Sequence, residues 1–510
     1  MLSKTIIKNT ILLTMASLFM RVVGLIFQVW VSKRIGADGL GLFQLIGSVS
    51  MFAATVAISG IRFATTRLVS EELGAHHYQG AIKALKRCMM YAGFFGTLVL
   101  VCLYFGAGFI GRTIIGRSET VASLRILALC LPFMSLSSVL SGYFTAVGRV
   151  IKTAVVSIAE QLVRISIIVI LLDMVAPNDI EHACAAIVTG NVAGECVSFL
   201  LHYVLYLHDK KTHLSGTGEG KCLTKRMFGI AAPLAVSAYT RTALTTAQNL
   251  LIPRGFEKSG ASSEKALADY GTIDGMVFPI ITFPSALFYA LADTLLPELT
   301  SAQVAGRQSH ITKLVSDLLS KCLIFSIGVT SVLFFFSDEL GQIIYSSLDV
   351  GHYIRIMSLL MPFMYMDSVT DGMLRGLGQH MYVMKYNISD ALMSLVLVIF
   401  LLPKYAVFGY IFILYFSELF NFFFSIRRLK KVSHFHIPIS AFLRPIIAAL
   451  GSVILTSLFA PPVHTSAITL VLHIIMSLSA YCMVLFLLPT GGKSKTGVKR
   501  RLQTVKQTSL

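Results

Sequence analysis

The chain has 510 residues, of which 55% are hydrophobic and only 13% are charged. An ordinary soluble domain has roughly 25% charged residues, and a single hydrophobic core stops growing at roughly 250–300 residues. With a mean hydropathy of +0.76, the apolar side chains cannot all be hidden in such a core. The composition therefore excludes a water-soluble enzyme and makes lipid the main solvent of the chain.

Apolar stretches long enough to cross a bilayer, about 20 residues each, recur along the whole chain. We therefore predict an all-α polytopic membrane protein with about 14 transmembrane helices. In chain order, the predicted spans cover residues 10–31, 40–61, 88–110, 121–146, 153–174, 181–207, 228–251, 272–296, 318–337, 352–374, 384–402, 408–425, 441–460 and 467–488.

The formal net charge of +18 is distributed according to topology. With the N-terminus inside, 28 of the 43 Lys and Arg residues fall in inner segments, 8 fall in outer loops, and the others lie within or at the edges of spans. This bias follows the positive-inside rule. It predicts a multi-pass protein of the cell membrane with both termini in the cytoplasm, and it explains the basic balance without a nucleic-acid partner.

The sequence contains an internal duplication. Residues 124–148 match residues 354–378 at a constant offset of 230, which pairs Pro132 with Pro362 and Gly142 with Gly372. A weaker match at offset 220 pairs Arg21 with Arg241 and Gln28 with Gln248. Each copy holds six spans, and an even number puts both copies in the same orientation. We predict two parallel six-helix lobes, residues 1–208 and 228–431, joined by a cytoplasmic linker, residues 209–227. Two additional helices (441–488) and a basic cytoplasmic tail (489–510) follow the second lobe.

Several predicted spans carry polar residues on one helical face. A charged side chain at the centre of a span costs about 2.5–3.5 kcal/mol on insertion scales and usually faces a bundle interior or a water-filled cavity. We therefore expect these faces to line a cavity or to form ion pairs; Glu160 and Arg164, four residues apart, are spaced for a pair within one helix. The candidate binding residues are Arg21, Gln28, Arg164, Arg241 and Gln248, and the candidate coupling or ion-pair residues are Glu160, Glu195, Asp390 and Glu418.

Enzyme and metal-site motifs are absent from the sequence. It contains no H-E-x-x-H, G-x-S-x-G or P-loop pattern, and its eight cysteines form no C-x-x-C pair. We expect no catalytic residue, no metal site and no cofactor.

Six sequence stretches carry a family resemblance. They are RVVGLIFQVWVSKRIGADGLGLFQLIGSV (residues 21–49), ATTRLVSEE (64–72), GYFTAVGR (142–149), AEQLVR (159–164), FPIITFPSALFYALADTLLPELTSA (278–302) and LPKYAVFGYIFILYFSELFNFFFSIRRL (402–429). The chain resembles the multidrug/oligosaccharidyl-lipid/polysaccharide (MOP) flippase superfamily, and within it the polysaccharide transporter branch. The resemblance implies two six-helix lobes around a V-shaped cavity, two extra helices and alternating access. It also implies a cationic cavity, in which Arg21, Arg164 and Arg241 would hold a pyrophosphate, since guanidinium matches phosphate oxygens bidentately.

The predicted function is a flippase that moves a polyprenyl-pyrophosphate-linked saccharide, such as a peptidoglycan precursor, from the inner to the outer leaflet for cell-wall or spore-cortex synthesis. The carboxylates would bind a coupling cation, H⁺ or Na⁺, or pair with the arginines. The expected partners are the bilayer, this lipid and cell-wall synthesis proteins, and a monomer is expected. Two alternatives stay open: a cation-coupled exporter of drugs or metabolites, which a negative cavity would favour, and a non-transporting scaffold, which buried and paired arginines would favour.

Overall fold

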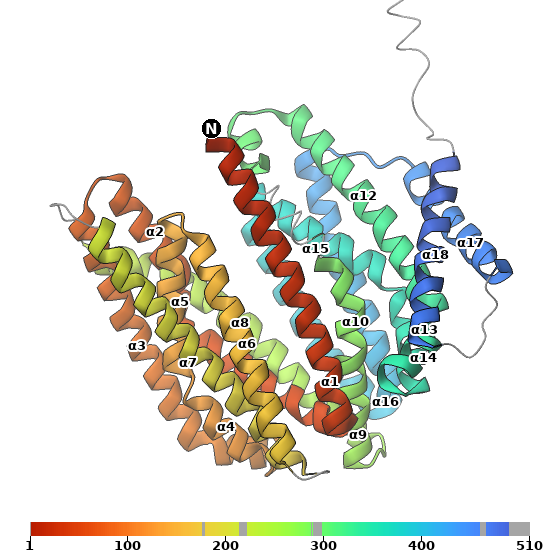
Figure 1. Cartoon of the computed structure of the whole chain (residues 1–510), viewed down its shortest axis with the longest axis horizontal. Helices are drawn as coiled ribbons and strands as arrows, with labels where there is room; N and C mark the ends of the chain where they lie inside the picture. Colours follow the sequence, from red (N-terminus) through yellow and green to blue (C-terminus); the bar gives the residue numbers. More distant parts are fainter. Residues whose placement is uncertain are drawn as a thin grey trace, which may run out of the picture. The chain divides into compact units, whose positions relative to one another are not determined.

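The computed structural model confirms an all-α protein: the residues that it describes form helices and short connections and contain no strand (Figure 1). It describes residues 2–175, 179–213, 222–286, 288, 298–459 and 466–488. Most of the predicted linker and the whole basic tail lie outside these ranges.

The chain folds into two compact units. Unit 1 combines Met1–Leu295 with Gly378–Ser425, and unit 2 combines Leu296–Leu377 with Ile426–Leu510. Unit 1 therefore takes residues from both predicted repeats, whereas unit 2 takes residues from the second repeat and from the two additional helices. The predicted lobe boundaries stay predictions, because the order of helices along the chain does not by itself decide which helices pack together.

Unit 1 contains most of the helices. In chain order they are α1 (Leu2–Ile58), α2 (Ile61–Gly74), α3 (Tyr78–Phe109), the π-helical η1 (Ile110–Ile115), α4 (Thr120–Ala128), α5 (Leu131–Ala146), α6 (Val150–Met174), α7 (Ile180–His213), α8 (Leu223–Lys258), α9 (Ser263–Tyr270), the π-helical η2 (Gly271–Val277), α10 (Phe278–Thr282) and the 3₁₀ turn η3 (Phe283–Ser285). The larger part of α16 (His380–Ser433) completes the unit.

Two of these helices are each long enough for two spans, and each breaks once. The break in α1 is at Gly36 (φ 75°, ψ 177°), inside the gap predicted between the first two spans. The break in α16 is at Ala406 (φ 45°, ψ −127°), inside the gap predicted between residues 402 and 408. In place of each expected loop, the chain therefore has a kink at one residue within a long helix.

Unit 2 begins with α12 (Gln308–Phe335), which is followed by α13 (Ser337–Leu340), the π-helical η4 (Gly341–Tyr345), α14 (Leu348–Ser358) and α15 (Met361–Gly376). The end of α16 leads into the last two helices, α17 (Ser440–Phe459) and α18 (Ala467–Leu487). α17 and α18 pack on α12, where the Tyr481 hydroxyl donates to the carbonyl of Ile324 at 2.6 Å. In Figure 1 these three helices lie side by side.

The duplication is visible in the helix boundaries. α3, α5 and α6 start at residues 78, 131 and 150, and α12, α15 and α16 start at residues 308, 361 and 380, which is 230 residues later in each case. Both copies place a π-helical segment before the predicted spans that begin near 121 and 352. Both also place a proline, Pro132 or Pro362, in the first turn after a helix break, where its missing N–H costs no hydrogen bond. α4 and α5 meet at this break with a bend of 43°.

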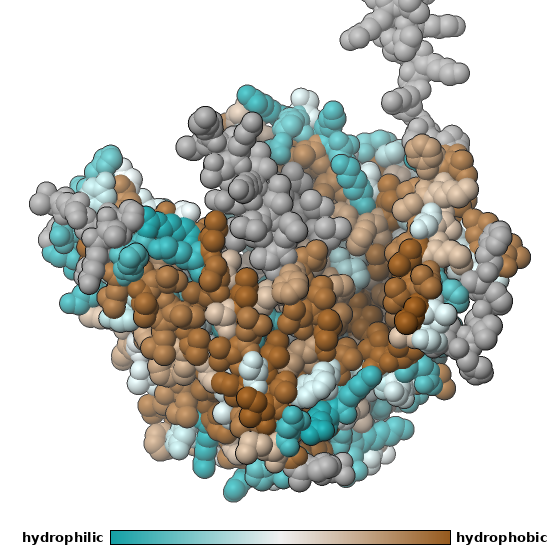
Figure 2. All heavy atoms as spheres, viewed as in Figure 1, coloured by the Kyte–Doolittle hydropathy of each residue, from teal (hydrophilic) through white to brown (hydrophobic). Residues whose placement is uncertain are grey.

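The apolar surface fits a bilayer. By length and composition, eight of the described helices can cross a membrane, or nine if α4 and α5 form one broken span. The exposed side chains of α3, α6 and α7 include Phe105 (80%), Val204 (61%) and Ile170 (59%). Figure 2 shows hydrophobic side chains along the middle of the helices in this region and hydrophilic ones at their ends. α8 is not among the eight, because polar residues interrupt its apolar sequence.

Candidate functional site

The polar face of α1 lines a pocket of about 430 Å³ in unit 1. Arg21, Gly24 and Gln28 come from the first half of α1, and Gln44 comes from the second half. The side chain of Arg21 is exposed, whereas Gln28 is half-buried. The opposite wall of the pocket consists of η2, α10 and η3, which contribute Asp274, Phe278, Pro279, Thr282 and Phe283.

Hydrogen bonds from α1 and α16 to the π-helical segment η2 hold this wall of the pocket in place. A π-helix shifts the backbone hydrogen bonds and is common at functional sites. Gln28 Nε2 donates to the carbonyl of Gly275 at 2.9 Å, and Gln44 Nε2 donates to the carbonyl of Asp274 at 3.4 Å. The Asp274 carboxylate accepts a hydrogen bond of 2.6 Å from the hydroxyl of Tyr410 on α16. Both halves of α1 are thus bound to η2 next to Arg21.

The backbones of α1 and η2 are in contact just above this pocket. A Cβ atom added at Gly41 would lie 2.1 Å from the carbonyl oxygen of Leu267, and one added at Gly271 would lie 2.0 Å from that of Ala37. Real Cβ atoms essentially never approach this closely. Only glycine fits at these two positions, so the sequence itself provides for a tight crossing of α1 with α9 and η2.

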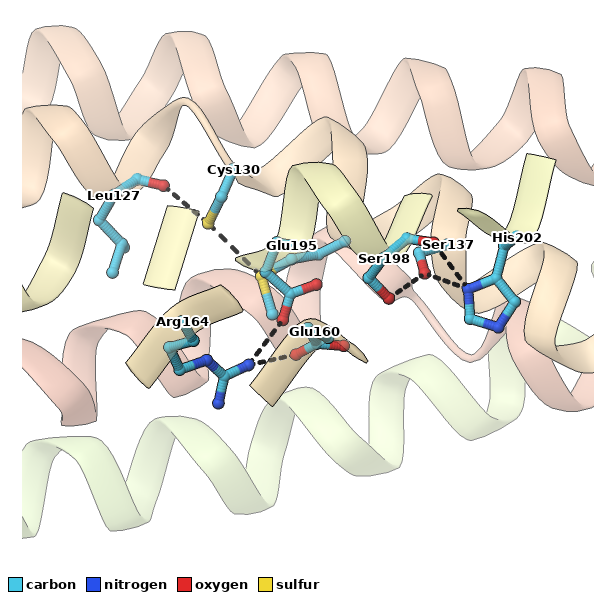
Figure 3. Close-up of polar contacts among 9 residues, drawn as sticks. Leu127, Cys130, Ser137, Glu160, Arg164, Glu195, Ser198 and His202 are labelled. Atoms are coloured by element: carbon cyan, nitrogen blue, oxygen red, sulfur yellow. Dashed lines mark hydrogen bonds and ion pairs between the residues drawn. The ribbon is translucent and has the colours of Figure 1, made fainter. Parts of the chain in front are cut away.

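A second polar group joins α6 and α7 (Figure 3). Arg164 forms an ion pair with Glu160 on its own helix, as the spacing predicted, and its Nη2 lies 4.0 Å from Glu195 Oε1 on α7. Nearby, Gln161 Nε2 donates to the carbonyl of Met20 at 3.3 Å, one residue before Arg21. The structure therefore places two carboxylates around Arg164 and attaches its helix to the polar face of α1.

The polar row of α7 continues beyond Glu195. His202, only 3% exposed, places Nδ1 3.1 Å from the Ser137 hydroxyl on α5 and 3.0 Å from the carbonyl of Ser198. The two serine hydroxyls lie 3.2 Å apart. Figure 3 shows these side chains pointing toward one another between α5 and α7. Hydrogen bonds at Nδ1 of His202 thus connect α5 and α7.

A third polar group surrounds Asp390. Its carboxylate accepts hydrogen bonds from Ser417 (2.9 Å) and Asn421 (2.8 Å), which lie beyond the break of α16, and from Ser394 at 3.4 Å. Arg241 on α8 interacts electrostatically with this carboxylate and has an exposed side chain. Asp390 thus connects the two halves of α16 and interacts with Arg241 of α8, one of the candidate binding residues.

The predicted residues fall into these separate groups. Arg21 and Gln28 share the α1 pocket, Arg164 contacts Glu160 and Glu195, and Arg241 faces Asp390. Gln248 lies half-buried on α8, beside an Asn249 that bonds to Ser48, and Glu418 follows Ser417 on α16. Among the described residues, no group of three or more His, Cys, Asp or Glu side chains is suited to a metal ion.

Asp274 is the pocket residue that the sequence analysis missed. The available signal was a carboxylate inside the predicted span 272–296, and an ionisable residue within a span is a functional candidate by default. Its partners could not be read from local spacing, because Tyr410 lies 136 residues away and Gln44 lies 230 residues away.

Comparison with known proteins decides the family. A family model described as "Polysaccharide biosynthesis protein" matches residues 6–303, more than half of the chain. The chain belongs to this polysaccharide biosynthesis family. It is 23% identical to stage V sporulation protein B of Bacillus subtilis (strain 168) over 416 residues, which cover 80% of each chain. It is 22% identical to the lipid II flippase MurJ of the same organism over 346 residues, 63% of this chain and 62% of MurJ.

Solved structures show the same fold. The lipid II flippase MurJ in an inward closed conformation matches with a TM-score of 0.68 at 15% identity, covering 93% of this chain and 98% of that one. An inward-facing multidrug resistance MATE family transporter of the MOP superfamily matches with a TM-score of 0.60 at 12% identity, covering 81% and 94%. This member of the polysaccharide biosynthesis family thus has the all-helical, multi-pass membrane fold of these two transporters.

Proposed function

We propose that this transporter is a flippase for a polyprenyl-pyrophosphate-linked saccharide, a cell-wall or spore-cortex precursor. The observation that carries the proposal is the α1 pocket, where the exposed guanidinium of Arg21 stands beside the amide of Gln28. A guanidinium donates two parallel hydrogen bonds to phosphate oxygens. Arg241 adds a second exposed cation on α8.

Alternating access gives the mechanism. Gly41 follows the break of α1 at Gly36, which lies on the outer side of the membrane in the predicted orientation. The contacts of α1 with η2 close the pocket on that side. Loss of the bonds from Gln28 to Gly275 and from Gln44 to Asp274 would open it. The pyrophosphate would stay on the arginines while the polyprenyl tail remains in lipid.

Coupling would use the carboxylates. Asp390 with Ser417 and Asn421 offers oxygen atoms of the kind that hard cations bind. Glu160 and Glu195 would balance Arg164, so that this arginine positions helices α6 and α7 while Arg21 contacts the substrate.

Binding of undecaprenyl pyrophosphate to the purified protein tests the proposal. Undecaprenol, which lacks the pyrophosphate, is the ligand control. Arg21→Ala and Arg241→Ala should each weaken binding of the pyrophosphate about tenfold or more, because a charge-assisted hydrogen bond contributes about 1.5–3 kcal/mol. Arg34→Ala is the matched control, since Arg34 pairs with Asp173 at the surface and does not line the α1 pocket. Equal binding by wild type and both pocket variants would contradict the proposal.

A cation-coupled exporter is the second candidate. It is favoured by the half-buried Asp274 in the same pocket, because a carboxylate would suit a cationic cargo. Tetraphenylphosphonium in the same binding assay separates the two: an exporter would bind it with an affinity that falls in Asp274→Asn, whereas the flippase would not. The exposure of Arg21 and Arg241 weighs against a closed scaffold in which these arginines would be buried.

A further inference from the structure

Unit 2 contains a separate pocket of about 590 Å³ at the junction of α12, α17 and α18. α12 contributes Ile324, α17 contributes Arg444, and α18 contributes Cys482 and residues 485–488. None of these residues belongs to the α1 pocket or to the polar groups around Arg164 and Asp390. Apart from Arg444 and Cys482, the lining side chains are aliphatic or aromatic.

Arg444 is the only charged residue of this lining, and its side chain is fixed in place. Its Nη2 donates to the carbonyls of Leu485 and Leu488, both at 2.9 Å. These are the last carbonyls of α18, which have no partner within their own helix. The Nε of Arg444 is buried and has no hydrogen-bond partner among the described residues. No carboxylate of those residues pairs with Arg444 either, so the guanidinium holds a full positive charge and an unused donor.

The position of the pocket along the helices indicates its depth in the bilayer. Arg444 is in the second turn of α17, and residues 485–488 end α18. Both ends lie on the predicted cytoplasmic side, where Arg427, Arg428, Lys430 and Lys431 close α16. Phe486 (89% exposed) and Leu487 (68% exposed) extend the apolar wall outward. A cation beneath the interface thus borders an apolar groove that opens to lipid.

We infer that this pocket binds one anionic phospholipid of the cytoplasmic leaflet, with its phosphate on Arg444 and an acyl chain along Ile324, Leu485 and Leu488. Basic pockets between transmembrane helices on the cytoplasmic side are suited to anionic head groups. The phosphate would accept a hydrogen bond from Nη1 of Arg444, since only Nη2 bonds to the described residues, and the aliphatic wall suits a chain that a soluble phosphate does not have.

Native mass spectrometry of the full-length protein with added dioleoyl phosphatidylglycerol or dioleoyl phosphatidylcholine tests this site. Wild type should retain one phosphatidylglycerol with about fivefold higher affinity than phosphatidylcholine, the ratio that corresponds to about 1 kcal/mol per basic residue near the membrane surface. Arg444→Gln should remove the preference. Lys430→Gln, which removes an exposed cation from the same predicted side outside the pocket, should keep it.

A second variant separates lipid binding from folding, because Arg444→Gln also removes the hydrogen bonds to α18. Cys482→Trp fills the groove from an exposed position and leaves Arg444 and both backbone acceptors in place. It should lose the retained phosphatidylglycerol while keeping the thermal unfolding midpoint of lipid-free wild type. Equal retention of the two lipids by wild type, equal loss in Lys430→Gln, or full retention in Cys482→Trp would overturn the inference. Stabilisation by glycerol phosphate equal to that by phosphatidylglycerol would overturn it in favour of a soluble anion.

Discussion

The crossing of α1 with η2 predicts an unusually large effect for a single added methyl group. In Gly41→Ala, the new Cβ would lie 2.1 Å from the Leu267 carbonyl oxygen, whereas ordinary contacts begin at 3.4 Å. The two backbones must therefore separate by about 1.3 Å. The hydrogen bond from Gln44 to Asp274 is already 3.4 Å long, and such a separation would break it.

Gly47→Ala is the matched control, since a Cβ at Gly47 meets nothing within 4 Å on the same helix. Both substitutions gain the same helix propensity of about 1 kcal/mol, so their difference isolates the clash. Overpacking costs about 1–3 kcal/mol, and Gly41→Ala should unfold a few degrees below Gly47→Ala in detergent. An introduced cysteine near Ala37 should also react faster with a membrane-impermeant maleimide. Equal midpoints and equal labelling for the two variants would refute the close crossing.

Three further predictions concern individual polar groups. Asp274→Leu should lower stability by about 1–3 kcal/mol, because the buried Tyr410 hydroxyl loses its acceptor, whereas Asp274→Asn keeps an acceptor and should stay near wild type in chemical unfolding. Asp209→Asn should loosen the predicted cytoplasmic ends of α5, α6 and α7, because this fully buried carboxylate binds Tyr143, Arg149 and Lys152; hydrogen exchange there should rise, and unchanged exchange would argue against it. The backbone N–H and the ring of His182 hold the pKa of Asp179 below its usual value at the start of α7. The stabilisation by the Asp179 carboxylate is present above about pH 3.8 and is lost as the pH falls through the lowered pKa of the folded state. Asp179→Ala should therefore speed exchange of the His182 amide at neutral pH, and the difference from wild type should shrink as the carboxylate becomes protonated.

Much of the fold could be predicted from local sequence. Apolar length gave the spans, and the breaks at Gly36 and Ala406 fall in predicted gaps. The 230-residue repeat predicted equivalent helices, and Gly148 and Gly378 both adopt positive φ, 72° and 67°. These features depend on residues close in sequence or on a repeated sequence pattern, so they can be recognised in a single sequence.

The parts that could not be predicted depend on distant partners. The pair of Glu160 and Arg164 follows from a spacing of four, but Glu195 joins it only through the packing of α7 on α6. The position of Asp274 depends on its hydrogen bond with Tyr410 and on the π-helical turn of η2. Neither feature produces a periodic pattern in the sequence. Arg444 stands near the start of the predicted span 441–460, and its pocket forms only where α12, α17 and α18 meet. The division of the second repeat between the two units has the same origin.

The central claim is that arginines within the membrane carry a pyrophosphate-linked lipid across it. Its most direct test is the rate at which a labelled lipid-linked cell-wall precursor becomes accessible to a membrane-impermeant reagent in vesicles that contain the protein. The account predicts fast translocation by wild type and Arg34→Ala, and loss of translocation in the double variant Arg21→Ala, Arg241→Ala at equal insertion and stability. Translocation by the double variant at the wild-type rate would contradict it.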